Sequence, residues 1–164
     1  MTLLPPWLRQ RLGGAAPPVS EAQLEDAPLL AALHGASFQR GWSAEEFERL
    51  LVERNVVADR AMAGTELAGF VVSRIAADQA EILSIAVDAS HRGLGLARKM
   101  LGVHLRRLAA YGVAAVFLEV DEGNVAARRL YAGFGFAQVG LRKSYYAQAG
   151  EETGAALVLR RDLA

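Results

Sequence analysis

Three polar side chains follow one another at a spacing that makes a site plausible: Glu119, then Asn124 five residues later, then Tyr131 after seven more. Glu119 lies in an otherwise apolar run, where a carboxylate is costly unless it meets water, a hydrogen-bond donor or a substrate amine. A carboxylate can accept a proton, and a phenol with an ordinary pKa near ~10 can donate one. Taken singly, Asn124 is more typical of a helix cap and Tyr131 of a core residue.

A second motif is typical of anion binding. The apolar run 82–87 ends at Asp88, and a turn with Gly93 and Gly95 leads into a helix that we expect over residues 94–111. A helix that begins there directs its unpaired N–H groups and the positive end of its dipole into the turn. Such an arrangement favours phosphate.

Several nucleotide-binding turns share this outline. A Walker loop would end in Gly-Lys-Ser/Thr, but Gly95 is followed by Leu96 and Ala97, which excludes it. A dinucleotide-binding turn fits Gly93-x-Gly95, with Glu119 on the next strand as the acid, yet Arg98 replaces the third glycine. No second mononucleotide-binding half follows. A glycine-containing connection without any ligand remains the alternative.

Composition limits the class of protein. The 164 residues are 52% hydrophobic and 22% charged, which fits one globular domain. Eighteen basic residues balance eighteen acidic ones, so we expect no nucleic-acid partner. The chain contains no cysteine, and His34, His91 and His104 lack ligand spacing, so we expect no metal. We find no leader pattern and no apolar run of ~18 to 20 residues, and therefore expect no membrane partner and a cytoplasmic location.

The order of expected elements indicates an α+β domain. Asp26 and Pro28 predict a helix start, and Ser43 with Glu46 forms a capping box that opens a second helix. We expect a strand near Val19, a hairpin of strands 56–63 and 67–76, a strand over 81–87 and a strand over 114–120 parallel to it, then a helix over 124–134 and strands over 136–146 and 155–160. Residues 1–17, rich in paired prolines and glycines, predict an extension before a domain over 18–164.

The loop Arg92-x-x-Gly95-x-Ala97 resembles the pyrophosphate loop of the GNAT acetyltransferase superfamily. The stretch 118–136, with Leu-Glu-Val and Gly-Phe at its ends, closely resembles the RimI-type ribosomal-protein alanine N-acetyltransferases of that superfamily. The resemblance covers most of residues 18–162. It implies the GNAT fold, an α+β fold whose mixed central sheet has splayed parallel strands flanked by helices. It also implies acetyl-CoA as cosubstrate and a chain that is a monomer or weak dimer.

The resemblance further assigns roles to residues. Glu119 would be the general base, and Tyr131 the general acid that protonates the CoA thiolate. The peptide would contact Trp42, Tyr145 and Tyr146. The cofactor would be held by Ile85, Ala86, Val87, Arg92, Gly93, Leu94, Gly95, Leu96, Ala97 and Asn124.

The implied reaction is transfer of acetyl to the N-terminal alanine amine of a protein, a ribosomal protein in this subfamily, by direct attack in a ternary complex. A small-molecule amine acceptor and a non-catalytic acyl-CoA-binding module remain alternatives. Asp121 and Glu122 depart from the subfamily pattern, because they make this strand end more acidic than expected.

Overall fold

The computed structural model describes residues 15–143 and 154–163. Tyr145 and Tyr146, both predicted to contact the peptide, lie outside the described residues, as do positions 1–14 of the predicted extension. The strands are β1 (Val19–Glu21), β2 (Val56–Ala63), β3 (Glu66–Ala76), β4 (Gln79–Val87), β5 (Ala115–Asp121), β6 (Ala137–Lys143) and β7 (Ala155–Asp162). The helices are η1 (Leu24–Asp26), α2 (Ala27–Ser37), α3 (Ala44–Val52), η2 (Ala89–His91), α4 (Leu96–Ala110) and α5 (Val125–Gly133).

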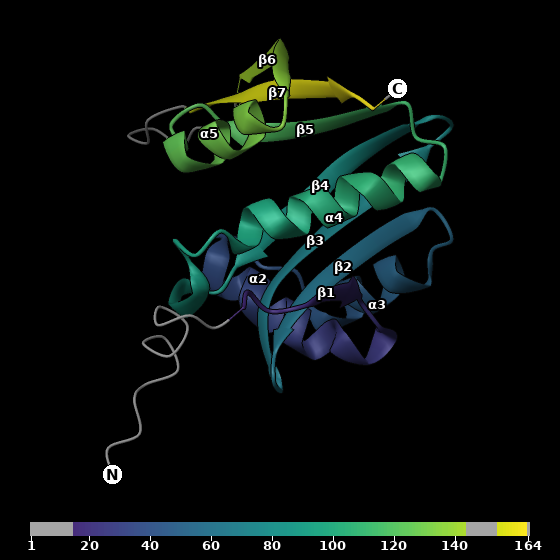
Figure 1. Ribbon diagram of the computed structural model, residues 1–164, viewed down its shortest axis with the longest axis vertical. Coiled ribbons are helices and arrows are strands. Elements are labelled where there is room, and N and C mark those ends of the chain that lie inside the picture. Colours follow the sequence, from purple (N-terminus) through teal and green to yellow (C-terminus); the bar gives the residue numbers. More distant parts are fainter. Residues whose placement is uncertain (1–14, 144–153, 164) are drawn as a thin grey trace.

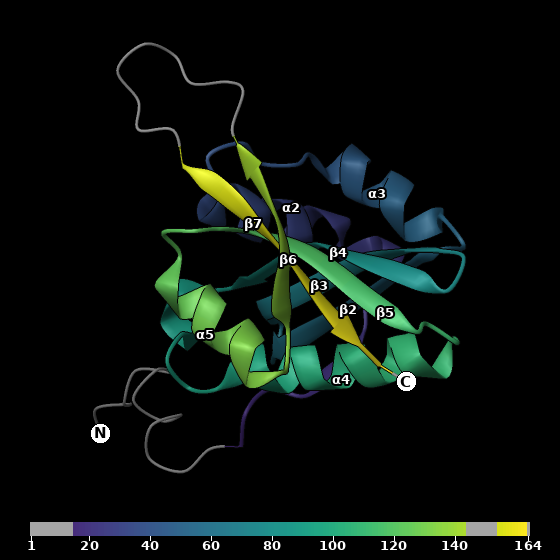
Figure 2. The same cartoon turned by 90° about the horizontal axis from the view of Figure 1, so that it is seen from above.

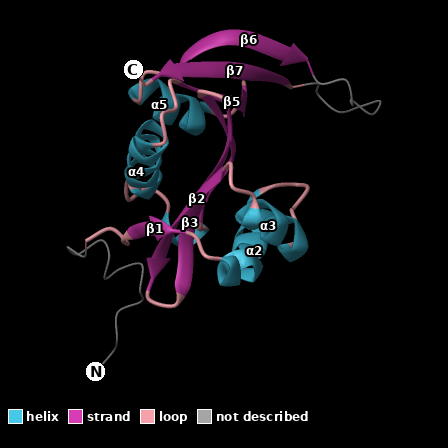
Figure 3. Cartoon of the chain, turned by 90° about the vertical axis from the view of Figure 1, so that its right-hand side faces the viewer, coloured by secondary structure: helices cyan, strands magenta, loops and turns pink. Residues whose placement is uncertain are grey.

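The described strands form one sheet in the order β1-β2-β3-β4-β5-β7-β6, so the last strand enters between β5 and β6 (Figure 1). All neighbours are antiparallel except β4 and β5, which are parallel. The expected mixed sheet is therefore confirmed. Helices α4 and α5 lie on one face of the sheet, and α2 and α3 lie on the other (Figure 3).

Strands β4 and β5 pair over only three residues each, Gln79–Glu81 with Ala115–Phe117. Beyond that point the two strands separate, and β5 crosses at a visible angle to β4 when the molecule is seen from above (Figure 2). Among the described residues, the carboxyl-terminal part of β4 therefore has a strand partner on the β3 side only. This confirms the prediction of splayed parallel strands.

Two apolar clusters fill the space between sheet and helices. The first lies under α4 and α5 and includes Met100, Leu101 and Tyr131. The second lies under α2 and α3 around Phe47 and Phe70, both fully buried. Each cluster fixes two helices against the face that they cover, because close-packed interiors leave little freedom of placement.

Helix α4 approaches the sheet closely because β3 carries a glycine beneath it. A Cβ atom at Gly69 would stand 2.7 Å from Met100 Cε and 3.0 Å from the carbonyl oxygen of Ala86. Only a residue without a side chain allows this approach. The first half of α4 is thus held beside the free end of β4.

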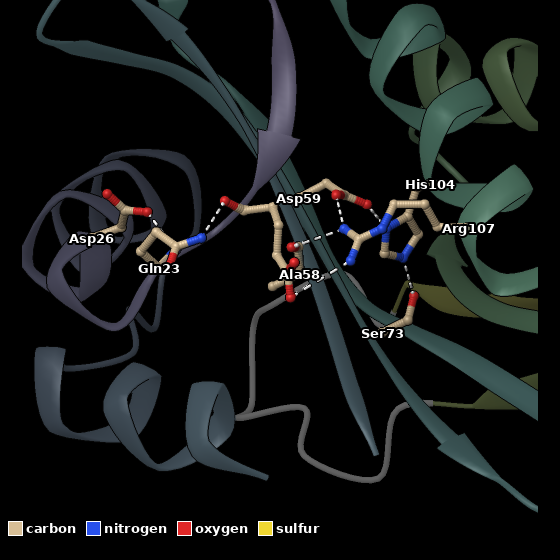
Figure 4. A network of polar contacts seen from close by, with 8 residues as sticks. Gln23, Asp26, Ala58, Asp59, Ser73, His104 and Arg107 are labelled. Atoms are coloured by element: carbon tan, nitrogen blue, oxygen red, sulfur yellow. Dashed lines mark hydrogen bonds and ion pairs between the residues drawn. The ribbon is translucent and has the colours of Figure 1, made fainter. Parts of the chain in front are cut away.

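A buried polar network fixes the middle of α4 to the sheet (Figure 4). His104 donates or accepts through both ring nitrogens, Nδ1 to Asp59 Oδ2 at 2.6 Å and Nε2 to Ser73 Oγ at 2.7 Å. All three side chains are fully buried, and Arg107 also pairs with Asp59. No sequence pattern indicates this network, because its members come from three separate elements.

Predictions that depend only on residues close together in the sequence agree with the structure. Ser43 and Glu46 form the capping box of α3, with Ser43 Oγ accepting from the Glu46 N–H at 3.1 Å. Asp26 is the N-cap residue of α2 and Pro28 lies in its first turn, as predicted. The Asp26 carboxylate makes no capping bond to α2, because it accepts from the Gln23 N–H at 2.6 Å and pairs with Arg60. The helix predicted over 94–111 begins only at residue 96, since Gly95 has a left-handed φ of 78°.

Candidate active site

A cavity of about 650 Å³ lies at the separated ends of β4 and β5. It is bordered by the β4–α4 turn on one side and by α5 on the other. Most of the predicted cofactor-binding residues and the predicted acid line it: Ile85, Ala86, Val87, Arg92, Gly93, Gly95, Leu96, Ala97, Asn124 and Tyr131. Leu94 is not among the lining residues and is 36% exposed. The fold therefore joins two motifs that are far apart in the sequence.

The turn before α4 is shaped by two glycines in the left-handed region, Gly93 with φ 76° and Gly95 with φ 78°. Gly95 is the N-cap, and no side chain caps the helix. The first N–H groups of α4 consequently face the turn without intrahelical partners. Together with the helix dipole they make this end of the cavity suited to an anion.

The segment leading into the turn is held by its own polar contacts. The Asp88 carboxylate accepts from the N–H of Ser90 at 3.1 Å and also from its hydroxyl. These bonds lower the pKa of Asp88, and the bond from the Ser90 hydroxyl has the largest effect. Partial burial acts in the opposite direction but is outweighed. His91 is buried, at 7% exposure, and lines the cavity. Arg92 donates from Nε to the carbonyl oxygen of Val87 at 3.1 Å.

The end of β4 directs backbone hydrogen-bonding groups toward the gap, and one of them, the Val87 carbonyl, already accepts from Arg92 Nε. The Asp88 N–H donates to the Ala68 carbonyl at 2.8 Å, which makes these two a hydrogen-bonded pair across β3 and β4. Since such pairs alternate along an antiparallel ladder, the N–H and C=O groups of Ile85 and Val87 point away from β3. They point toward the gap that β5 leaves open, while Ala86 pairs with β3.

Tyr131 lies on α5 at the inner end of the cavity and is 5% exposed. Its ring packs edge-on against Phe136, with ring centroids 5.7 Å apart. Burial raises the pKa of the Tyr131 phenol to about 12. The phenol is therefore protonated throughout the neutral range and can act as a hydrogen-bond or proton donor.

Asn124 is the N-cap of α5, and its Oδ1 accepts from the Ala127 N–H at 3.1 Å. It also lines the cavity. The capping role and the predicted cofactor contact are compatible, because the cap uses the amide oxygen and leaves the amide N–H₂ group as a donor.

Glu119 does not line the cavity. Along β5 the residues Val116, Leu118 and Val120 are buried under α4 and α5, so alternation places Glu119 on the opposite face of the sheet. Its side chain is 39% exposed, and it accepts a hydrogen bond from Arg142 Nη1 at 2.9 Å. Glu119 and Tyr131 thus lie on opposite faces of the sheet, and the Glu119 carboxylate bonds to Arg142 on β6, on the side of β5 that is away from β4.

Trp42, the described member of the predicted peptide site, lies on the same side of the sheet as Glu119. Its ring stacks on His34 at 4.4 Å, and its backbone N–H donates to His34 Nδ1 at 3.0 Å. Burial lowers the pKa of His34, which favours the neutral ring that accepts this bond. Trp42 borders a second hollow of about 360 Å³ between α3 and the strands β3 and β4. The cofactor cavity is also lined by Ser37 and Phe38 at the end of α2, so it reaches the face of the sheet on which this hollow lies.

Three charged groups at the site were not predicted from the sequence. Arg98 on α4 and Arg129 on α5 line the cavity, and Arg142 pairs with Glu119. Arg98 follows the glycine turn directly, which was a usable signal, whereas the other two arginines carry no spacing that indicates a site.

Two absences hold for the described part of the chain. In residues 15–143 and 154–163, no three histidine, cysteine or acidic side chains are grouped so that they could hold a metal. None of the helices in these ranges is both long and apolar enough to cross a membrane.

Parallel strands that separate beside a glycine turn and a helix N-terminus define the acyl-CoA N-acyltransferase class of fold. The model of the acetyltransferase (GNAT) family matches residues 23–136. The chain therefore belongs to the GNAT acetyltransferase family and is an acetyltransferase, as the sequence resemblance predicted. Enzymes of this family use acetyl-CoA.

The chain is similar to ribosomal protein bS18-alanine N-acetyltransferases, which confirms the RimI-type resemblance. It is 30% identical to the enzyme of Escherichia coli K12 over 128 residues, 78% of this chain and 86% of the relative. It is 35% identical to the Haemophilus ducreyi enzyme over 77 residues, 47% of this chain and only 53% of that relative.

Solved structures show the same fold. The ribosomal-protein-S18-alanine N-acetyltransferase of E. coli superposes with a TM-score of 0.80 at 25% identity, covering 89% of this chain and 93% of that one. Arabidopsis thaliana NAA60 in complex with acetyl-CoA gives a TM-score of 0.76 at 20% identity, covering 89% and 98%.

Proposed function

We propose that the protein transfers the acetyl group of acetyl-CoA to the N-terminal alanine amine of a protein, by direct attack in a ternary complex in the cytoplasm. One observation carries the proposal. A protonated, buried phenol lines the cavity beside the gap between β4 and β5, and an accessible carboxylate lies on β5 on the opposite face of the sheet.

The cofactor would lie along the free edge of β4. The diphosphate would bind at the turn of residues 92–97, where the N–H groups of α4 point outward. The pantetheine arm would pair with the backbone of Ile85 and Val87 as an added strand. This places the thioester at the gap, and the Val87 N–H becomes a donor that can polarise its carbonyl.

The acceptor amine would approach from the face that carries Glu119 and Trp42. An α-amino group has a pKa near ~8, so a large share is ammonium at neutral pH and must lose a proton before it attacks. Glu119 would take that proton directly or through water. The amine nitrogen then bonds to the thioester carbon, and the carbon–sulfur bond breaks.

The departing thiolate would receive its proton from Tyr131. The phenol lies on the cofactor side of the gap and keeps its proton because burial raises its pKa to about 12. The products are the N-acetylated acceptor and CoA with a free thiol. Asn124 would orient the cofactor by donating from its amide group, since its oxygen is used in capping α5.

The acceptor class is supported by the relatives, which are named for the alanine of ribosomal protein bS18. The hollow beside Trp42 offers space on the correct face for a peptide segment. A small polycationic amine is less well matched, because two of the three acidic residues in this hollow are engaged, Glu53 with Arg74 and Glu46 with the backbone of Ser43, which leaves Glu81.

The test measures CoA release from acetyl-CoA with an Ala-initiated peptide, the same peptide acetylated beforehand, and free amines including spermidine. We expect turnover with the free peptide alone, and loss of most of it in Glu119→Gln. Equal or greater turnover with the small amines would reject the peptide assignment and retain the transferase. Full activity of Glu119→Gln would reject Glu119 as the base.

A further inference from the structure

The cofactor cavity contains more positive charge than a diphosphate requires. Arg92, Arg98 and Arg129 all line it, and none of the described residues that line it is acidic. Arg92 belongs to the turn itself and already bonds to the end of β4. Arg98 and Arg129 come from two different helices, outside the turn.

These two arginines converge on one face of α5. A Cβ atom at Gly133 would lie 3.8 Å from Arg98 Nη2, so the guanidinium of Arg98 crosses from α4 to the end of α5. Gly133 stands four residues after Arg129, and residues four apart lie on the same face of a helix. The absence of a side chain at position 133 leaves room for the Arg98 guanidinium beside the Arg129 position.

Neither guanidinium is neutralised by a carboxylate in the described chain. The arginines Arg60, Arg74, Arg107, Arg142 and Arg160 each form an ion pair within residues 15–143 and 154–163, whereas Arg98 and Arg129 form none there. Two like charges held near each other without an acid favour an anionic ligand between them.

We infer that Arg98 and Arg129 form a clamp for the 3′-phosphate of CoA and so make the enzyme select CoA over its dephosphorylated form. The inference rests on the proposed function, because it concerns the same cavity. A phosphate monoester carries a charge of about −1.5 to −2 at pH 7 and three acceptor oxygens, which suits two forked guanidinium groups. The N-terminus of α4 and Arg92 would then bind the diphosphate of CoA.

The experiment compares CoA with dephospho-CoA by calorimetric titration of the full chain at low salt. The wild type should bind CoA about tenfold or more tightly than dephospho-CoA. Arg98→Gln and Arg129→Gln should each reduce this ratio several-fold, and the double variant should bring it close to one. Affinity for dephospho-CoA should stay within about twofold, and added salt should reduce the wild-type ratio, since both groups are exposed.

Arg128→Gln is the matched control. Arg128 precedes Arg129 on α5, is exposed, donates from Nη1 to the Glu122 carbonyl oxygen at 3.0 Å, and does not line the cavity. The ratio of the affinities of this variant for CoA and dephospho-CoA should equal that of the wild type. If Arg98→Gln and Arg129→Gln weaken both ligands equally, the arginines hold the diphosphate and the inference is wrong. A wild type that binds both ligands equally rejects the inference alone, whereas one that binds neither rejects the proposed function as well.

Discussion

The Glu119 carboxylate on β5 accepts a hydrogen bond from the Arg142 guanidinium on β6 at 2.9 Å, across the intervening strand β7. Both side chains are partly exposed, at 39% and 69%. Arg142 therefore occupies the carboxylate at which the ammonium form of the acceptor would bind. Because Arg142 bonds to the Oε1 atom of this carboxylate, we expect it to compete with the acceptor for Glu119.

This competition predicts the behaviour of Arg142→Gln. Removing the guanidinium should lower KM for the peptide by about two- to fivefold, since exposed ion pairs contribute only about 0.2 to 1 kcal/mol. The kcat value should change less. Initial rates over a range of peptide concentrations measure both constants. Lys143→Gln is the control, because adjacent strand residues point to opposite faces of the sheet, and its KM should equal that of the wild type. A KM that rises in Arg142→Gln would mean that Arg142 binds the peptide.

The variant Tyr131→Phe tests whether Tyr131 is the general acid. The substitution keeps the ring that packs on Phe136 and removes only the hydroxyl group, so folding should be preserved. A positioned proton donor contributes about 10²- to 10⁴-fold to rate, and kcat should fall within that range. The CoA dissociation constant should change little. The thermal midpoint of unfolding should stay within a few degrees of the wild type, and unchanged kcat would remove Tyr131 from the mechanism.

The pH dependence of stability offers a second test of the same residue. Burial raises the pKa of Tyr131 from 10.0 to about 12, so the folded state favours the neutral phenol. The resulting stability is fully present below about pH 10 and is lost as pH rises toward 12. Urea unfolding between pH 8 and pH 11 should show a decline that is smaller in Tyr131→Phe. Equal declines in the two proteins would show that the phenol is not buried.

Local sequence signals predicted the elements well, because caps and turns depend on neighbours. Ser43, Asn124 and Gly95 each stand where a helix begins, and the glycine turn lies where two elements meet. The features that were not predicted depend on contacts between residues far apart in the sequence. The ion pair of Arg142 joins residues that are 23 positions apart, and the position of β7 between β5 and β6 leaves no local pattern.

Gly95→Glu should abolish CoA binding. Its Cβ atom would meet nothing within 4 Å, so the protein itself has room for a side chain, but that space is where the diphosphate would lie. The added carboxylate would also repel phosphate.

Gly64→Glu is the matched control, since Gly64 has a similar φ of 65° with nothing within 4 Å and lies in the β2–β3 turn. Both variants incur a backbone cost of about 1 to 2 kcal/mol. Calorimetric titration should show CoA binding by Gly64→Glu only; binding by both would exclude the turn from the cofactor site.

Asp59→Asn should strongly destabilise the fold without touching the site. The Asp59 carboxylate is fully buried and contacts both His104, at 2.6 Å, and Arg107. Removing one partner of a buried charged network leaves the others without their counter-charge, which costs about 3 to 5 kcal/mol. Asp162→Asn makes the same chemical change in an exposed pair with Arg160 and should cost less than about 1 kcal/mol. Urea unfolding at pH 7 measures both free energies, and equal values would show that the network of Asp59, His104 and Ser73 does not hold α4 to the sheet.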